Sequence, residues 1–303
     1  MTGALLSRAV AASLASIADR LIPEPPDAWH PVAWFGTGMT RLEQRIWRDD
    51  RAAGAVYTAA GLSVGVLAGV VVRSTTVALT VAVAARQLGT VGGDIGTQLE
   101  RGDLEGARGA LPSLVGRDPS ELDASGVAAA VVESLAENSV DAVIAPLFWG
   151  FVAGAPGALG YRAINTMDAM VGHRSERFEN FGWASARLDD VANWVPARLF
   201  AAAVQATNPS ATASVRRAVR EDAGAHPSPN AGVAEAAVAG ALGVELGGTL
   251  RYGERVEHRP LLGRGPRPDG STIAHARSVC DRAQVAVLAA AAVVGWATGK
   301  ATR

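Results

Sequence analysis

The segment Ala52–Val72 limits the folds open to this chain more than any other part of the sequence. It lies between Arg51 and Arg73, and its 21 residues include no ionisable side chain except Tyr57. A helix of about 20 apolar residues crosses the roughly 30 Å of hydrocarbon in a bilayer. We therefore expect this segment to form a membrane-spanning helix.

Three glycines, Gly61, Gly65 and Gly69, recur at every fourth position within this segment. Small residues at this spacing form a stripe along one helical face, which lets the backbone of a second helix approach closely. A chain rich in alanine and glycine can also produce such a stripe without any packing role. Both interpretations are open at the level of the sequence.

The rest of the chain extends the membrane prediction. Of its 303 residues, 49% are hydrophobic and only 19% are charged, which is more apolar than an average soluble domain. The fold class we predict is an all-α, polytopic integral membrane protein with large polar loops and helices that carry the motifs. We predict one catalytic domain over residues 1–303, with candidate spans at residues 2–18, 52–72, 74–91 and 283–299.

Two further apolar segments do not fit a simple crossing. Residues 142–161 carry no charge but contain Pro146 and Pro156, and proline removes a helical hydrogen bond. We expect this segment to be re-entrant or buried. Residues 199–215 begin apolar and then become polar, so we expect an interfacial or buried helix.

Charge and residue usage exclude several classes of function. The net charge is −1 and the cationic residues are scattered, so nothing indicates binding of nucleic acid. The single cysteine, Cys280, excludes an internal disulfide, and the single lysine, Lys300, excludes the lysine of a P-loop. Arginines are frequent in residues 19–51 and 216–282, which predicts that these segments and the active site face the cytoplasm of a multi-pass cell-membrane protein.

The first polar motif surrounds Val131. Glu133, Glu137 and Asp141 are four residues apart, so a continuous helix would present all three carboxylates on one face, with Asn138 beside them. Like charges at this spacing repel, which favours a bound cation or facing arginines. A solvated acidic face is the alternative, but the surrounding residues are apolar.

A second motif combines Asn165 and Asp168 on one face, followed by His173 and Arg174. Amide and carboxylate oxygens suit Mg²⁺, and the planar guanidinium of arginine suits phosphate. The alternatives are that Asn165 caps a helix and that Asp168 forms an ion pair with a nearby arginine.

A third motif repeats this chemistry over Ala186–Arg198. Asp189 and Asp190 point to different faces of a helix, so we expect one to bind a ligand and the other to pair with an arginine. We choose Asp190 as the ligand because we place it on the face of Asn193 and Arg187.

Two proline-containing loops hold further polar residues. His30 precedes Pro31, and His226 and Asn230 belong to the segment His226–Gly232. Proline restricts the backbone and so reduces the entropy lost on ordering a site, although the same pattern is usual in a turn.

These motifs resemble the CobD/CbiB family, adenosylcobinamide-phosphate synthase. The resemblance is carried by Glu133-Ser-Leu-Ala-Glu-Asn-Ser-Val-Asp141, Asn165-Thr-Met-Asp168, Ala186-Arg-Leu-Asp-Asp-Val-Ala-Asn193, Pro196-Ala-Arg198 and Ser228-Pro-Asn-Ala-Gly232. It implies an integral membrane enzyme of cobalamin biosynthesis that uses ATP and Mg²⁺. The implied reaction joins adenosylcobyric acid to aminopropanol phosphate, or to aminopropanol, through an amide bond. Possible partners are the later enzymes that assemble the nucleotide loop.

Together, the residues and the resemblance give the expected site. ATP would activate a carboxylate of the corrinoid, while Mg²⁺ and arginines offset the developing charge. We expect catalytic roles for Glu137, Asp190 and His226, the last as a candidate base. The expected Mg²⁺ ligands are Glu133, Glu137, Asp141, Asp168, Asp189 and Asp190, with Glu133 and Asp189 as outer-sphere or alternate ligands. The expected substrate- or phosphate-binding residues are Arg174, Arg187, Arg198, Asn138, Asn165, Asn193, Asn230 and His30.

Two other classes of protein remain open from the sequence. A membrane prenyltransferase-like enzyme would also use Asn and Asp runs to hold Mg²⁺-diphosphate. A non-catalytic transporter or corrinoid-binding subunit would instead line a pathway with its buried charges. Activity on isoprenoid diphosphates would indicate the first, and corrinoid binding without turnover would indicate the second.

Overall fold

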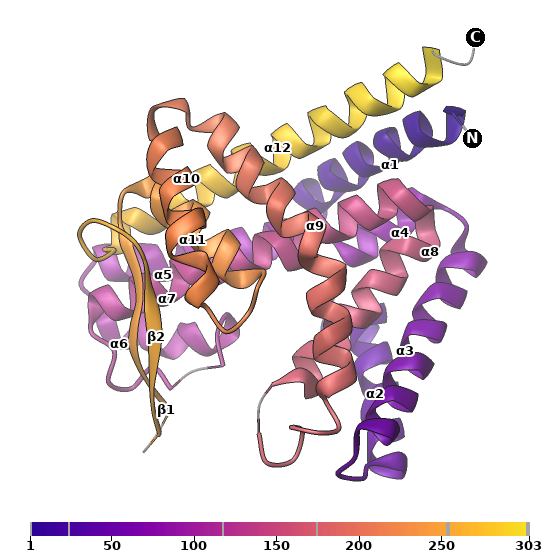
Figure 1. The fold of residues 1–303 in the computed structure, drawn as a ribbon, viewed down its shortest axis with the longest axis horizontal. Helices are drawn as coiled ribbons and strands as arrows, with labels where there is room; N and C mark the ends of the chain where they lie inside the picture. The colour runs from indigo at the N-terminus through magenta and orange to yellow at the C-terminus, as the bar shows by residue number, and fades with distance from the viewer. Residues whose placement is uncertain (1, 24, 117, 174, 253–254, 301–303) are drawn as a thin grey trace. The chain divides into compact units, whose positions relative to one another are not determined.

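The computed structural model describes residues 2–23, 25–116, 118–173, 175–252 and 255–300, and within these ranges it is mainly helical (Figure 1). The predicted all-α membrane fold class is confirmed, with one small antiparallel hairpin added. The α-helices are α1 Thr2–Leu21, α2 Pro31–Ile46, α3 Arg51–Val72, α4 Thr75–Ala82, α5 Ala85–Glu100, α6 Leu104–Ala110, α7 Ala124–Ser139, α8 Ala145–Met167, α9 Trp183–Thr207, α10 Thr212–Glu221, α11 Ala231–Leu242 and α12 Gly270–Lys300. The strands are β1 Glu245–Tyr252 and β2 Arg255–Gly263, and short π-helical segments, η3 Val140–Ile144 and η4 Asp168–Gly172, flank α8.

The chain divides into two compact units, each built from segments that are distant in sequence. Unit 1 comprises Met1–Ala85, Asp141–Asn193 and Leu288–Arg303, and unit 2 comprises Arg86–Val140 and Trp194–Val287. Helices α9 and α12 contribute residues to both units.

Three helical stretches in the described part of the chain are long and apolar enough to cross a membrane. They are Arg51–Val72, Ala124–Gly172 and Gly270–Thr298. The first matches the predicted span at residues 52–72, and the third contains most of the predicted span at 283–299 but begins well before it. The predicted span at residues 2–18 forms α1, which is not among the three.

The prediction of one spanning helix over residues 74–91 is wrong. Helix α4 ends at Ala82 after eight residues, and α5 begins at Ala85. At the break, the backbone N–H of Ala84 donates to the carbonyl of Ala142, 3.0 Å away, instead of continuing the helix. Several apolar side chains of α4 are buried against protein, which accounts for their character without a membrane crossing.

Residues 142–161 are helical and largely buried by protein, and they lie within the stretch Ala124–Gly172, so their re-entrant or buried placement stays a prediction. The helix is broken at Gly154, whose φ of 67° and ψ of −150° suit glycine and not a residue with a side chain. Pro156 lies just after this break, where the helical hydrogen bonds have already been interrupted.

The stripe of glycines in α3 packs against α8 within unit 1. A β-carbon at Gly65 would lie 2.7 Å from the carbonyl oxygen of Leu159, and one at Gly69 would meet the backbone of Pro156. Only glycine permits this approach, so the small-residue stripe has a packing role.

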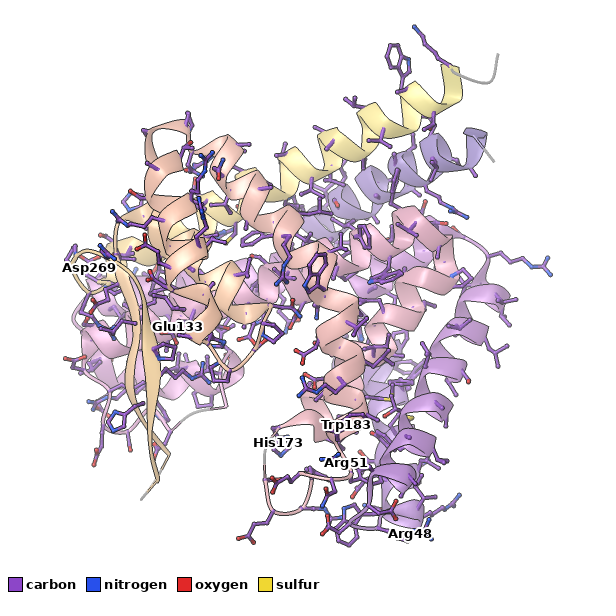
Figure 2. All side chains as sticks on the ribbon, in the orientation of Figure 1. Arg48, Arg51, Glu133, His173, Trp183 and Asp269 are labelled. Carbon is purple, nitrogen blue, oxygen red and sulfur yellow. The ribbon has the colours of Figure 1, made fainter. Side chains whose placement is uncertain are left out.

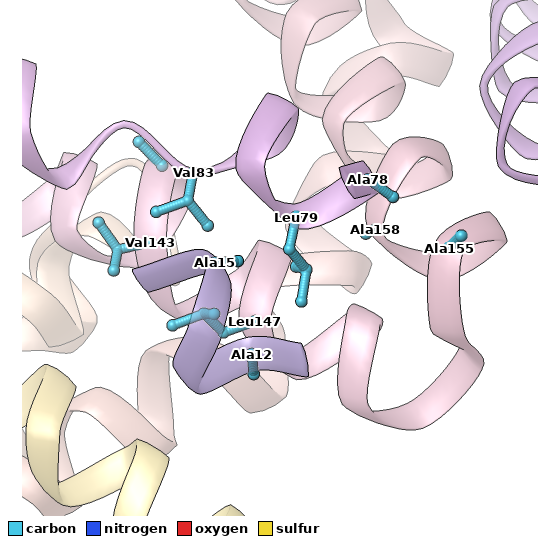
Figure 3. Packing of buried hydrophobic residues seen from close by; sticks show 10 residues of the cluster. Ala12, Ala15, Ala78, Leu79, Val83, Val143, Leu147, Ala155 and Ala158 are labelled. Carbon is cyan, nitrogen blue, oxygen red and sulfur yellow. The ribbon is translucent and has the colours of Figure 1, made fainter. Parts of the chain in front are cut away.

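The core of unit 1 is built from small side chains of several helices (Figure 3). Ala12 of α1, Leu79 and Val83 around α4, and Leu147 and Ala158 of α8 lie in one buried cluster. Alanine lets these helices pack closely. Helix α1 also runs beside the C-terminal end of α12, where a β-carbon at Gly295 would contact the backbone of Leu6.

Unit 2 surrounds α11, an apolar helix that is buried over most of its length. A helix that is apolar on every side has to be covered by protein or lipid. Here α7, α10 and the β1–β2 hairpin contact it. The predicted segment 199–215 is itself partly buried, since Phe200, Val204 and Val215 are inaccessible to solvent.

Candidate functional site

A chain of hydrogen bonds links two helices of unit 1 through Asn193. The Tyr161 hydroxyl of α8 donates to Asn193 Oδ1 at 2.8 Å, and Asn193 Nδ2 donates to Asp189 Oδ2 at 2.9 Å. Asn193 is almost fully buried, and both its amide oxygen and its amide nitrogen take part in these hydrogen bonds. The position of the Asp189 carboxylate is therefore fixed from α8 as well as from α9.

Asp168 and Asn165 also face Asp189. Burial and the negative charge of Asp168 raise the pKa of Asp189 from 3.8 to about 8, while the hydrogen bond from Asn193 and the nearby amide of Asn165 oppose this shift. Two carboxylates that repel each other in a poorly solvated place favour a proton or a cation between them. The structure thus brings together three predicted residues, Asn165, Asp168 and Asp189.

Asp189 and Asp190 have different partners in the structure. Asp190 pairs with Arg187, with Nη1 and Oδ2 3.3 Å apart, whereas Asn193 contacts Asp189. Residues three and four apart both share a helical face, so Asp189 and Asp190 are each neighbours of Asn193, and the hydrogen bond of Asn193 is made to Asp189. The expected pairing of Asn193 with Asp190 is therefore not the one that forms, and the choice of Asp190 as the ligand stays a prediction.

Asp141 belongs to the same region of unit 1, because its charge and that of Asp189 both act on the Tyr161 hydroxyl. It lies in the π-helical segment η3, after α7 has ended at Ser139. The regular α-helical spacing that predicted one face for Glu133, Glu137 and Asp141 therefore stops before Asp141. Glu133 and Glu137 belong to unit 2.

The carboxylates of unit 1 would supply part of the coordination shell of a magnesium ion. Among the residues that the structure describes, no three His, Cys, Asp or Glu side chains form a group able to hold a metal by themselves. Mg²⁺ is usually held by one or two carboxylates, with water and substrate phosphates completing the shell. Asp168 and Asp189 supply two carboxylates, and Asp189 Oδ1 is buried without a hydrogen-bond partner in the described structure. Such an oxygen is suited to a cation.

Glu133, in unit 2, forms a hydrogen bond with a backbone group (Figure 2). It is only 2% exposed, and its Oε1 accepts a hydrogen bond of 2.9 Å from the backbone N–H of Gly247 in β1. The guanidinium of Arg267 donates to the carbonyl of the same Gly247 at 2.8 Å. Asn138, also of α7, donates to Ser134. The predicted residues Glu133 and Asn138 therefore each form a hydrogen bond within the protein.

Arg198 and Asn230 are in contact within unit 2. Arg198 Nη1 lies 2.7 Å from Asn230 Oδ1, and the guanidinium stacks on Trp194 with its carbon 4.7 Å from the ring centroid. Burial lowers the pKa of the Arg198 guanidinium below its usual range.

His226 lies near Asn230 in sequence and is buried with Glu235 of α11. Its Nε2 is 3.7 Å from Glu235 Oε1, and the two side chains are 5% and 2% exposed. Its Nδ1 lies 3.1 Å from the backbone nitrogen of Ser228. This burial ties His226 to the folding of the loop, and a role as base stays a prediction.

Two predicted residues, His30 and Arg174, are not part of these clusters in the described structure. His30 caps α2, with its Nδ1 accepting from the N–H of Val32 at 3.2 Å. Arg174 lies outside the described residues. Its neighbour His173 packs edge-on against Phe178 on the loop before α9, and Figure 2 shows it in the same part of unit 1 as Arg51 and Trp183.

Three residues that take part in these clusters, Tyr161, Trp194 and Glu235, are not among the predicted site residues. Tyr161 is the last residue of the apolar segment 142–161, and its apolar neighbours give no sign of a polar role. Its spacing from Asp168, seven residues or about two helical turns, was the available signal for a shared face.

Comparison with known proteins gives one consistent family. The family described as CobD/Cbib protein matches residues 12–280. A relative from Mycobacterium tuberculosis (strain CDC 1551 / Oshkosh), named cobalamin biosynthesis protein CobD, is 46% identical over 86% of this chain and 88% of its own. Proteins of the same name from Rhodobacter capsulatus and Chromobacterium violaceum are 42% and 40% identical, over 84% and 93% of this chain and 85% and 96% of theirs. No solved structure matches the chain.

Proposed function

The chain belongs to the CobD/CbiB family of cobalamin biosynthesis, and from this premise we propose that it is an ATP- and Mg²⁺-dependent amide-forming ligase. Its substrates are adenosylcobyric acid and aminopropanol phosphate, or free aminopropanol, and its product is adenosylcobinamide phosphate or adenosylcobinamide. The observation that carries the proposal is the pair of facing carboxylates, Asp168 and Asp189, held between the amides of Asn165 and Asn193.

The acidic cluster of unit 1 supports a role in binding the magnesium nucleotide. Asp168 and Asp189 would hold Mg²⁺, which supplies positive charge to offset that of the ATP phosphates. Asp141 adds negative charge close by, and Asn165 offers an amide. Arg187, held by Asp190, remains exposed enough for a phosphate oxygen to reach it.

The chemistry of amide formation explains why such a cluster is useful. A carboxylate does not condense with an amine in water, so it has to be activated by transfer of a phosphoryl group from ATP. The attacking amine also has to lose a proton. His226 remains our candidate for that step, with a carboxylate that binds no metal as the alternative.

A location in the cell membrane is the second part of the proposal. The three long apolar helical stretches support it, and the arginine-rich segments 19–51 and 216–282 favour an active site that faces the cytoplasm. Cysteines introduced at the exposed positions Ser120 and Glu176 should then react with an impermeant reagent from the same side of the membrane.

Purified protein in detergent gives the direct test. It is incubated with ATP, Mg²⁺, adenosylcobyric acid and either form of aminopropanol, and mass spectrometry follows the corrinoid. We expect a corrinoid amide together with ADP and phosphate, both lost when EDTA removes Mg²⁺. Corrinoid binding without any amide, with every substrate present, would contradict the proposal and favour a binding or transport role. Turnover of isoprenoid diphosphates alone would favour the prenyltransferase class.

A further inference from the structure

Arg198 of α9 is held in unit 2 by neutral groups. Its Nη1 donates to the carbonyl of Trp194 at 3.1 Å and to Asn230 Oδ1 at 2.7 Å, and its Nη2 donates to the carbonyl of Pro229 at 3.2 Å. The ring of Trp194 covers one face of the guanidinium. These contacts fix both the position and the plane of the group.

No carboxylate in the described part of the chain pairs with Arg198, which distinguishes it from arginines elsewhere. Arg187 pairs with Asp190, Arg177 with Glu43 at 2.6 Å, and Arg264 with Glu221 at 3.0 Å. Arg198 is partly buried, and this burial alone lowers its pKa. A cation withdrawn from water and surrounded by neutral acceptors has a charge that an anion would balance.

The guanidinium also has hydrogen-bonding capacity left. Three of its five N–H groups donate to Trp194, Asn230 and Pro229, which leaves the one on Nε and one on Nη2 without an acceptor in the described structure. Two N–H groups of one arginine bind two oxygens of a phosphate in a parallel, bidentate arrangement.

We infer that Arg198, with Asn230 and Pro229 holding it, is the binding subsite for the phosphate monoester of the amine substrate. The inference rests on the proposed function for the identity of that substrate. A phosphate bound through Mg²⁺ needs carboxylates near it, whereas Arg198 pairs with none in the described structure. The subsite is therefore suited to a phosphate that binds without a metal, unlike the phosphates of ATP.

Two variants test this with little disturbance of the fold. Arg198→Ala removes the guanidinium. Asn230→Asp keeps the size of the side chain but gives Arg198 an internal carboxylate in the place where Asn230 Oδ1 now accepts. The matched control is Arg264→Ala, which removes an exposed arginine of the same unit that is paired with Glu221.

The first readout is binding of aminopropanol phosphate, and of inorganic phosphate, to the full-length protein in detergent without ATP or Mg²⁺, by calorimetry. We expect saturable binding to the wild type and to Arg264→Ala, and a loss of at least about 30-fold in affinity for Arg198→Ala and Asn230→Asp. Unchanged affinity in both variants, or no binding to the wild type, overturns the subsite. This readout does not need catalysis, so it can succeed or fail separately from the proposed activity.

The second readout is steady-state kinetics, which identifies the anion. We expect Arg198→Ala to raise KM for aminopropanol phosphate and to leave KM for ATP, for adenosylcobyric acid and for free aminopropanol unchanged. A rise in KM for ATP or for the corrinoid carboxylate instead would assign Arg198 to another substrate. A change that appears only when nanodiscs contain anionic phospholipid would assign it to a lipid headgroup, and either result overturns the inference.

Discussion

Asn193 donates a hydrogen bond to Asp189, one helical turn earlier in α9, at 2.9 Å. Because Asn193 also accepts from Tyr161, the carboxylate of Asp189 is oriented by a residue of another helix. Asp190, the next residue, instead pairs with Arg187 near the surface. Two adjacent carboxylates thus have different environments, and they should differ in function.

Substitution of each aspartate by asparagine tests this difference. We expect Asp189→Asn to lower kcat by more than about 100-fold, because a ligand is lost from the proposed magnesium site. Asp190→Asn removes one partly exposed ion pair, worth up to about 1 kcal/mol, so activity should fall by less than about tenfold. Corrinoid amide formation at saturating ATP measures both. Equal loss in the two variants would remove the distinction between these residues.

The raised pKa of Asp189 predicts how stability depends on pH in the absence of Mg²⁺. Asp189 ionises near pH 8 in the folded protein, against an ordinary value of 3.8. Between these values the unfolded chain binds fewer protons than the folded one, so the free energy of unfolding falls as pH rises from about 4 to about 8. The midpoint of thermal unfolding in detergent, measured from pH 5 to pH 9 with EDTA, should decrease accordingly.

Asp189→Asn should flatten this profile, since its side chain does not titrate. Glu105→Gln, which removes an exposed carboxylate of α6, serves as the control and should follow the wild type. Mg²⁺ in excess should raise the midpoint of the wild type at pH 8 and have little effect on Asp189→Asn. A profile that is the same in the wild type and in Asp189→Asn would contradict the proposed environment.

The sequence was sufficient to predict features that depend on local pattern. The apolar length of residues 52–72 predicted α3, and the resemblance of the motifs identified the family. The i,i+4 relation of Asp189 and Asn193 was also present in the sequence, but we assigned Asn193 to the neighbouring aspartate. Choosing between adjacent residues requires knowing which side of α9 faces α8. The hydrogen bond from Tyr161 of α8 to Asn193 shows this only in the three-dimensional structure.

Features set by tertiary contact could not be predicted in this way. The apolar segment 74–91 has the composition of a spanning helix, yet the helix is interrupted where the Ala84 N–H bonds to Ala142. Glu133 carries the charge expected of a metal ligand, but it accepts a hydrogen bond from the backbone N–H of Gly247, 114 residues away in the sequence. In both cases the partner is a distant backbone group, which residue type does not reveal.

The packing of α3 on α8 gives a prediction of stability. In Gly65→Ala the new methyl group would lie 2.7 Å from the Leu159 carbonyl oxygen and the Ala163 β-carbon, so the helices have to separate. We expect a cost of about 1–3 kcal/mol and a lower midpoint of thermal unfolding. Gly38→Ala in α2 is the control, because no atom lies within 4 Å of a β-carbon there. A midpoint equal to that of the control would mean that the helices do not pack as closely as described.

Glu133 gives the last prediction, because its structural and metal-binding interpretations differ in their response to substitution. Glu133→Gln keeps an oxygen that can accept from the Gly247 N–H, whereas Glu133→Ala leaves that buried donor without this acceptor. If Glu133 mainly holds the hairpin, the Gln variant should retain most amide-forming activity. The Ala variant should lose about 1–3 kcal/mol of stability, seen as a lower midpoint of thermal unfolding. A magnesium ligand would behave differently, since the neutral amide of Gln binds Mg²⁺ less well than a carboxylate does. The activity of the Gln variant would then fall while its stability stayed unchanged, and the activity would recover at high Mg²⁺ concentration.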